Sequence, residues 1–74
     1  MAVKSQENLV YQIGSALAAD PRTKNAVIEV IDDRGVITLQ GKVESVKARN
    51  AAEGIAAQQG GVATVINELV VAFS

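Results

Sequence analysis

Apolar residues near the start of the chain recur at helical spacing. They lie four residues apart, at Leu9, Ile13 and Leu17. This spacing places them on one stripe of a helix of about four turns. Ser5 can cap the start of that helix through its hydroxyl. The pattern ends at Asp20-Pro21, because a proline disfavours helical conformation in the residue before it. Residues 22–25 are then expected to form a short polar connection.

Two later segments, residues 26–32 and residues 36–43, are rich in Val and Ile and are typical of strands. Asp33-Arg34-Gly35 lies between them and predicts a turn, since glycine adopts positive φ at little cost. The sequence therefore predicts a β-hairpin.

A second helix is expected from Val46 to Gln59, capped by Ser45. Its inner face is small and apolar: Ala48, Ala51, Ala52, Ile55 and Ala56. Gly54 is unusual inside a helix, where it costs about 1 kcal/mol relative to Ala, and a close backbone contact would explain it. Gly60-Gly61 stops the helix, and residues 62–73 form the third predicted strand.

The predicted order α-β-β-α-β defines an α+β fold. The helix between the second and third strands makes those two strands parallel, whereas the hairpin strands are antiparallel. We therefore expect a three-stranded mixed sheet with both helices packed on one face. At this length the chain is expected to be a single domain over residues 1–74, with its core at about residues 5–73.

The composition of the chain excludes several classes of function. The 74 residues include no Cys and no His, so a Ser-His-Asp triad, a Cys-His pair and a His- or Cys-ligated zinc site are excluded. We expect no enzyme, no catalytic residues, no cofactor and no metal. Seven Lys and Arg against eight Asp and Glu, with only Tyr11 and Phe73 aromatic, argue against a nucleic-acid partner.

Membrane and export signals are not evident in the sequence. No apolar run approaches the roughly 20 residues that span a bilayer. The first eight residues, MAVKSQEN, contain no apolar segment, so we expect no secretory signal in this chain. The residues alone leave the compartment open.

Three stretches together, in this order and spacing, resemble one protein family. They are IGSALAADPRTKNAVIEV, GVITLQGKV and GGVATVINELVV, within residues 9–71. This pattern resembles the BON domain (bacterial osmotic-stress and nodulation domain). Gly35, Gly41, Gly61 and Asn67 fall on positions of the family pattern, whereas Gln59-Gly60 departs from it in a loop. The resemblance implies a non-catalytic module of envelope and osmotic-stress proteins that contacts phospholipid membranes or other proteins, and hence a periplasmic or envelope location.

Two positions invite a structural interpretation. Gly41 lies inside a predicted strand, and we expect it to permit close contact with the Ala-rich second helix rather than to contact a ligand. Asn67 alternates with apolar residues that face the helices, so we expect it to tie a loop or a helix end to the sheet. Asp32 and Asp33 are expected to serve the turn, because two carboxylates fall short of a calcium site.

Two surfaces are candidates for binding. Lys42, Lys47 and Arg49 lie near the start of the second helix and could meet anionic headgroups, although a solvated face is the simpler interpretation. The face of the sheet away from the helices is expected to carry an apolar patch: Val27, Ile31, Val36, Ile66 and Val70. We expect this face, or the edge of the third strand, to pack against a second copy or another BON domain.

The sequence therefore favours a non-enzymatic binding module that contacts a phospholipid surface, peripherally, or an envelope protein. The alternative is a structural, oligomerisation or regulatory module of a larger protein with no lipid contact. Salt-sensitive binding to anionic vesicles distinguishes the two.

Overall fold

The computed structural model describes the backbone of residues 5–72 and the side chains of residues 9–72. In chain order the elements are α1 (Ser5–Ala19), β1 (Val27–Asp33), β2 (Val36–Val43), α2 (Val46–Ala57) and β3 (Thr64–Val71). The expected cap at Ser5 and the strand position of Phe73 concern side chains that lie outside the described residues.

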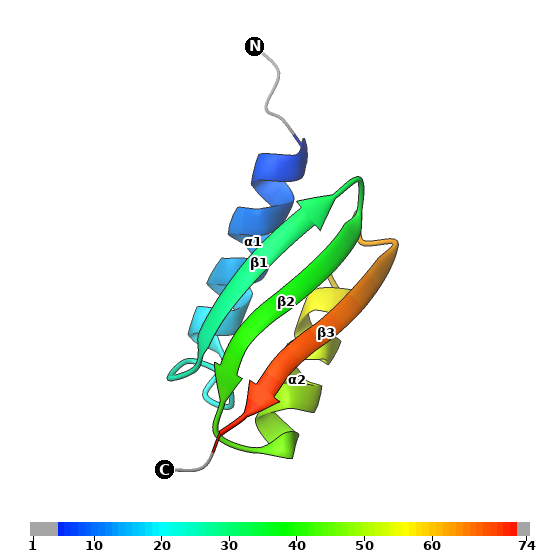
Figure 1. Cartoon of the computed structure of the whole chain (residues 1–74). Coiled ribbons are helices and arrows are strands. Elements are labelled where there is room, and N and C mark those ends of the chain that lie inside the picture. The colour runs from blue at the N-terminus through cyan, green and yellow to red at the C-terminus, as the bar shows by residue number, and fades with distance from the viewer. Residues whose placement is uncertain (1–4, 73–74) are drawn as a thin grey trace.

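The predicted fold is confirmed. β2 is the central strand, with β1 antiparallel and β3 parallel to it. Figure 1 shows that α1 and α2 both cover the same face of this sheet, so its other face is open. α1 packs mainly on β1 and α2 mainly on β3.

The core lies between the helices and the sheet. Its buried apolar members are Leu9, Ile13, Leu17, Ile37, Leu39, Val43, Ala48, Ala52, Ile55, Ala56 and Leu69. The four-residue stripe of α1 and the small inner face of α2 are therefore buried as the sequence predicts. Ser45 caps α2, because its hydroxyl accepts a hydrogen bond from the Ala48 N–H at 3.1 Å.

The hairpin turn also fixes the start of β3. Arg34 and Gly35 both have positive φ, +56° and +89°, the combination of a type I′ turn. The Gly35 carbonyl accepts hydrogen bonds from the N–H groups of Ala63 and Thr64 at 2.8 and 3.3 Å. Because Gly35 holds this loop, pairing with β2 begins at Thr64, two residues later than the predicted start of the third strand.

Gly41 corrects one expectation. It has a φ of +135°, and a Cβ on it would lie 1.9 Å from the Val27 carbonyl oxygen of β1. The close neighbour that excludes a side chain is therefore the main chain of the adjacent strand, not the second helix. The sequence pattern missed this because strand pairing, rather than helix packing, brings the backbones together here.

Candidate functional site

One end of the molecule gathers basic side chains. The topology brings together the end of α1, the start of β1, the end of β2 and the start of α2, at the bottom of Figure 1. Four exposed cations come from these segments: Arg22, Lys24, Lys42 and Lys47. We call this set, with the segments that carry it, the basic end.

Carboxylates are fewer at the basic end. Only Asp20 and Glu44 lie on the same segments, and Asp20 is paired with Arg22 at 2.8 Å. The opposite end, at the hairpin turn, carries Asp32 and Asp33 against Arg34. Among the described side chains, charge is therefore unevenly distributed between the two ends, although the net charge of the chain is only −1.

Exposed valines accompany the cations. Val27 begins β1, Val46 begins α2 and Val70 lies near the end of β3, with 76, 58 and 58% of their surface exposed. These positions bring apolar side chains to the same end as Lys24, Lys42 and Lys47. A surface that combines cations with exposed aliphatic groups has the chemistry needed to meet an anionic lipid headgroup layer.

The predicted cationic trio does not lie on one surface. Lys42 is on the open face of the sheet, between Val27 and Val70 in the strand register. Lys47 is exposed on α2. Arg49 is half-buried and donates hydrogen bonds to the main-chain carbonyls of Leu69 and Asn67 at 3.2 and 3.4 Å. The Arg49 guanidinium is therefore engaged with β3, which leaves Lys42 and Lys47 as the exposed members.

Asn67 faces the helices and holds α2 against β3. Its Nδ2 donates to the Arg49 carbonyl at 3.0 Å and to the Glu53 carboxylate at 3.2 Å. Its Oδ1 accepts from the Leu69 N–H at 3.1 Å. These contacts use both ends of the amide within the fold.

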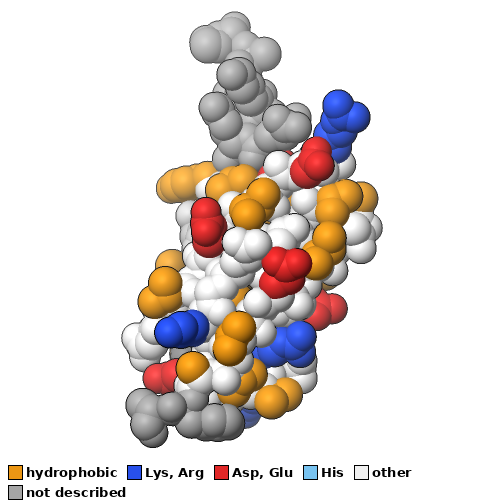
Figure 2. Space-filling view, in the orientation of Figure 1, with side chains coloured by type: hydrophobic (Ala, Val, Ile, Leu, Met, Phe, Trp, Pro, Cys, Tyr) orange, Lys and Arg blue, Asp and Glu red, His pale blue; other side chains and the backbone are white. Residues whose placement is uncertain are grey.

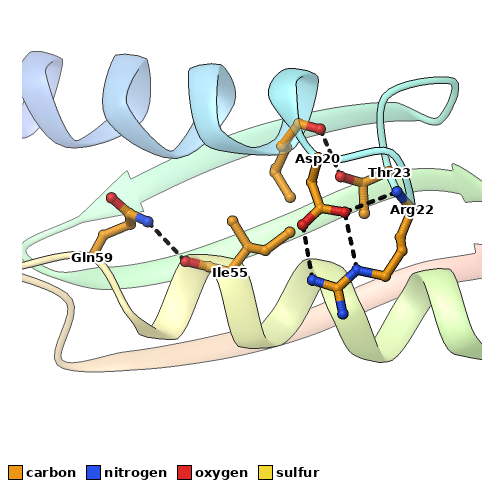
Figure 3. A network of polar contacts seen from close by, with 6 residues as sticks. Asp20, Arg22, Thr23, Ile55 and Gln59 are labelled. Atoms are coloured by element: carbon orange, nitrogen blue, oxygen red, sulfur yellow. Dashed lines mark hydrogen bonds and ion pairs between the residues drawn. The ribbon is translucent and has the colours of Figure 1, made fainter.

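A shallow groove separates α2 from the turn that follows α1. Residues on this groove include Asp20, Arg22, Lys47, Asn50 and Gly54. Figure 3 shows the Arg22 guanidinium folded back onto the Asp20 carboxylate, with two side-chain hydrogen bonds of 3.0 and 2.8 Å. These bonds, with a third from the Arg22 N–H, lower the pKa of Asp20 to about 2. Asp20 is therefore ionised near neutral pH and is unsuited to act as a general acid there.

Nothing contacts the position of a side chain on Gly54: a Cβ there would meet no atom within 4 Å. The close backbone contact that would have explained this glycine is absent. Gly54 instead leaves the wall of the groove open to solvent.

The open face of the sheet is divided into rows by the strand register. The isoleucine row consists of Ile31, Thr38 and Ile66, and the acidic row of Glu29, Gln40 and Glu68. Beyond the acidic row lie Val27, Lys42 and Val70, and beyond the isoleucine row lie Asp33, Val36 and Thr64. The five predicted apolar residues share this face, but the acidic row separates them into two groups. Figure 2 shows hydrophobic, acidic and basic side chains interspersed over it.

Sequence reasoning missed Arg22, Lys24 and Val46 as members of the basic end. Along the chain, residues 22–25 indicate only a polar connection, and Val46 indicates only the start of a helix. The predicted topology contained the signal, because it already places the end of the first helix beside the start of the second.

Two features are absent from the described residues. No helix among them combines the length and apolar character needed to cross a bilayer. Within the same part of the chain, no three Asp or Glu side chains converge in a way that could hold a metal ion.

Comparison with protein families identifies the family of this chain. Residues 5–72 match the model described as BON domain, which covers all five elements of the fold. A comparison with curated proteins gave no match.

Proposed function

The chain therefore belongs to the BON domain family, a family of non-catalytic binding domains, and we propose that it contacts anionic phospholipid surfaces through its basic end. The observation that carries the proposal is the convergence at one end of the domain of three exposed lysines, Lys24, Lys42 and Lys47, with three exposed valines; Arg22 at the same end is paired with Asp20. Contact would be peripheral, with the side chains reaching the headgroup layer from outside.

Electrostatic attraction supplies the first part of the binding. A Lys or Arg near an anionic membrane surface contributes about 1 kcal/mol, and this attraction is lost within a Debye length of about 8 Å at physiological salt. Glu44 offsets part of it at the basic end. Two or three effective charges alone contribute about 2–3 kcal/mol, which corresponds to a dissociation constant of about 6–30 mM. Contact through the cations alone is therefore weak and strongly dependent on salt.

The exposed valines supply the second part of the binding free energy. Burial of an exposed Val side chain is worth about 1.5 kcal/mol or more when it leaves water completely. Val27 and Val70 flank Lys42 in the strand register, and Val46 precedes Lys47 at the start of α2. An envelope protein with an acidic, partly apolar surface would offer the same chemistry, and it is the other partner that this surface fits.

The second candidate function is assembly of a larger protein without lipid contact. It is favoured by the exposed side chains of Ile31 and Ile66, which lie on the open face of the sheet away from the basic end. The two isoleucines flank Thr38 in one row of the sheet, and exposed aliphatic residues gathered on one face are more typical of a protein contact than of a solvated surface.

Vesicle co-sedimentation tests the proposal. The wild-type chain should sediment with vesicles that contain anionic phospholipid at low salt, less at high salt, and little with zwitterionic vesicles. The variant Lys47→Glu should lose a large part of this binding. Arg34→Glu makes the same type of charge change at the opposite end and should retain it. Absence of binding to anionic vesicles, or equal loss in both variants, would reject the basic end as a lipid site.

A further inference from the structure

The open face of the sheet carries a second surface with its own chemistry. Ile31 and Ile66 are 40 and 44% exposed and flank Thr38 in the isoleucine row. One row away on one side lie Glu29 and Glu68, and one row away on the other lies Asp33. Two exposed isoleucines thus lie between acidic positions.

These carboxylates lack cationic partners within the described residues. The hydrogen bond recorded for Glu68 comes from the neutral Gln40 amide, at 3.0 Å, and no ion pair involves Glu29 or Asp33 in that part of the chain. A protein that covers the isoleucines would also approach these charges. Burial of an unpaired carboxylate is costly, so a favourable partner must bring cations to both sides of its apolar contact.

The dimensions of the face fit a helix. The outer strands of a three-stranded sheet are about 9.6 Å apart, and a helix with its side chains is about 10–12 Å wide. Successive rows are about 6.6 Å apart along the strands, and residues i and i+4 of a helix are separated by about 6.0 Å. Residues four apart on a helix laid along the strands therefore meet successive rows.

We propose that the open face binds a cationic amphipathic helix of a partner protein, in which an apolar residue has Lys or Arg four positions before and four positions after it. The apolar residue packs between Ile31 and Ile66. One cation meets Glu29 and Glu68, and the other meets Asp33. This contact does not depend on lipid binding, because the basic end lies beyond the acidic row.

The same charges disfavour the other occupants. In a twofold packing whose axis runs along the strands, the acidic row of one copy meets the acidic row of the other and brings four carboxylates together. An anionic membrane is repelled by this row for the same reason. With the axis along the strands, a second copy of the chain, which the apolar pattern predicts as a partner, is therefore less favourable than a cationic helix.

The test uses the full chain and a synthetic probe. The probe is an Ala-rich helical peptide with one central Leu and a Lys four residues before and after it, and the control peptide carries Glu in place of both Lys. Amide chemical shifts of the chain are followed as each peptide is added up to millimolar concentration. The Lys peptide should shift amides around Ile31, Thr38 and Ile66 with saturable weak affinity, because the surface is smaller than a standard interface. The Glu peptide should not.

Two variants locate the contact. Glu29→Lys should weaken binding of the Lys peptide about tenfold or more, whereas Glu44→Lys, the same change at the basic end, should alter it less than about twofold. Ile66→Thr should weaken binding without a change in charge, which keeps the test valid if Glu29→Lys does not fold.

Four results would overturn the proposal: no shifts on the face, equal binding of both peptides, equal effects of the two Glu variants, or self-association of the chain through this face in sedimentation. Vesicle binding that survives in each of these cases leaves the function proposed for the basic end intact. Vesicle binding lost in Ile66→Thr, which leaves the charge unchanged, would overturn the proposal as well, since the face would then contact lipid.

Discussion

Arg49 and Asn67 each donate a hydrogen bond from the side chain to the main-chain carbonyl of the other. The Asn67 Nδ2 is 3.0 Å from the Arg49 oxygen, and the Arg49 Nη2 is 3.4 Å from the Asn67 oxygen. One residue lies in α2 and the other in β3, so the pair joins the crossover helix to the edge strand that follows it.

This pair also occupies main-chain groups of an edge strand. The carbonyls of Asn67 and Leu69 accept from Arg49, and the Leu69 N–H donates to the Asn67 Oδ1. An edge strand whose backbone groups are bonded to side chains is a poor template for another strand. The middle of β3 is therefore not suited to the edge-to-edge packing that the sequence suggested as one possibility, and the open face is the better candidate surface.

We expect Asn67→Ala and Arg49→Met each to lower the free energy of unfolding by about 1–3 kcal/mol, because each leaves partly buried polar groups unpaired. The double variant should cost less than the sum, with a coupling of about 0.5 kcal/mol or more. Urea denaturation of the wild type, the two single variants and the double variant measures this coupling energy. Strict additivity would show that the two residues act independently.

Glu53→Gln is the matched control for this cycle. The Gln side chain keeps an oxygen that can accept from the Asn67 Nδ2, which is now 3.2 Å from a Glu53 oxygen. Its effect on the unfolding free energy should stay within about 0.5 kcal/mol, as for other exposed substitutions.

Two glycine substitutions should change stability in opposite directions. Gly41→Ala should cost about 3 kcal/mol or more, because its Cβ would lie 1.9 Å from the Val27 oxygen and the φ of +135° is strained for Ala. Gly54→Ala should raise the unfolding free energy by about 0.5–1 kcal/mol, because the helix gains propensity and the new methyl group meets no atom. Thermal unfolding of both variants provides the measurement. A destabilising Gly54→Ala would contradict the open position of this residue.

The two glycines show what a sequence can predict. Hydrophobic periodicity and turn residues were sufficient for the five elements, their order and the layer of helices on one face of the sheet. The predicted reason for the glycine at position 41, close contact with the second helix, was wrong. The sequence pattern identifies a position without a side chain, but it does not show which backbone approaches that position. Arg49 was assigned to the surface for a similar reason: its carbonyl partners lie 18 and 20 residues away and are brought close only by the fold.

Acid should reduce the contribution of Asp20 to the free energy of unfolding within a defined pH range. The folded state lowers the pKa of Asp20 from 3.8 to about 2 through its hydrogen bonds with Arg22. A lowered pKa means that the folded chain favours the ionised carboxylate, so the stabilisation is complete above about pH 4 and is lost as the pH falls through about 2. The stability difference between wild type and Asp20→Asn should therefore be constant from pH 7 to pH 5 and shrink between pH 4 and pH 2.

Urea denaturation at several pH values checks this dependence, and a carboxyl NMR titration of Asp20 provides a direct readout. Arg22→Gln should move the titration of Asp20 toward 3.8, because the charged hydrogen-bond donor is removed. An unchanged titration in that variant would show that Arg22 does not cause the shift.

Part of the basic end could be predicted from the sequence. Lys42 and Lys47 were selected from their proximity along the chain, and the predicted topology also implied that the end of the first helix lies beside them. The buried state of Thr23 was not accessible in this way. It belongs to a run of polar residues, and only the packed turn shows that its side chain points inward.

Thr23 is 2% exposed, and its hydroxyl donates to the Leu17 carbonyl at 2.6 Å. That carbonyl is in the last turn of α1, where main-chain oxygens lack partners within the helix. Thr23→Val preserves the shape of the side chain but leaves the oxygen unpaired, and should cost about 1–3 kcal/mol of unfolding free energy. Thr23→Ser keeps the hydroxyl and loses one methyl group, which should cost about 1 kcal/mol. Urea denaturation should thus show that Thr23→Val is less stable than Thr23→Ser. The reverse order would show that Thr23 stabilises the fold mainly through packing of its methyl group.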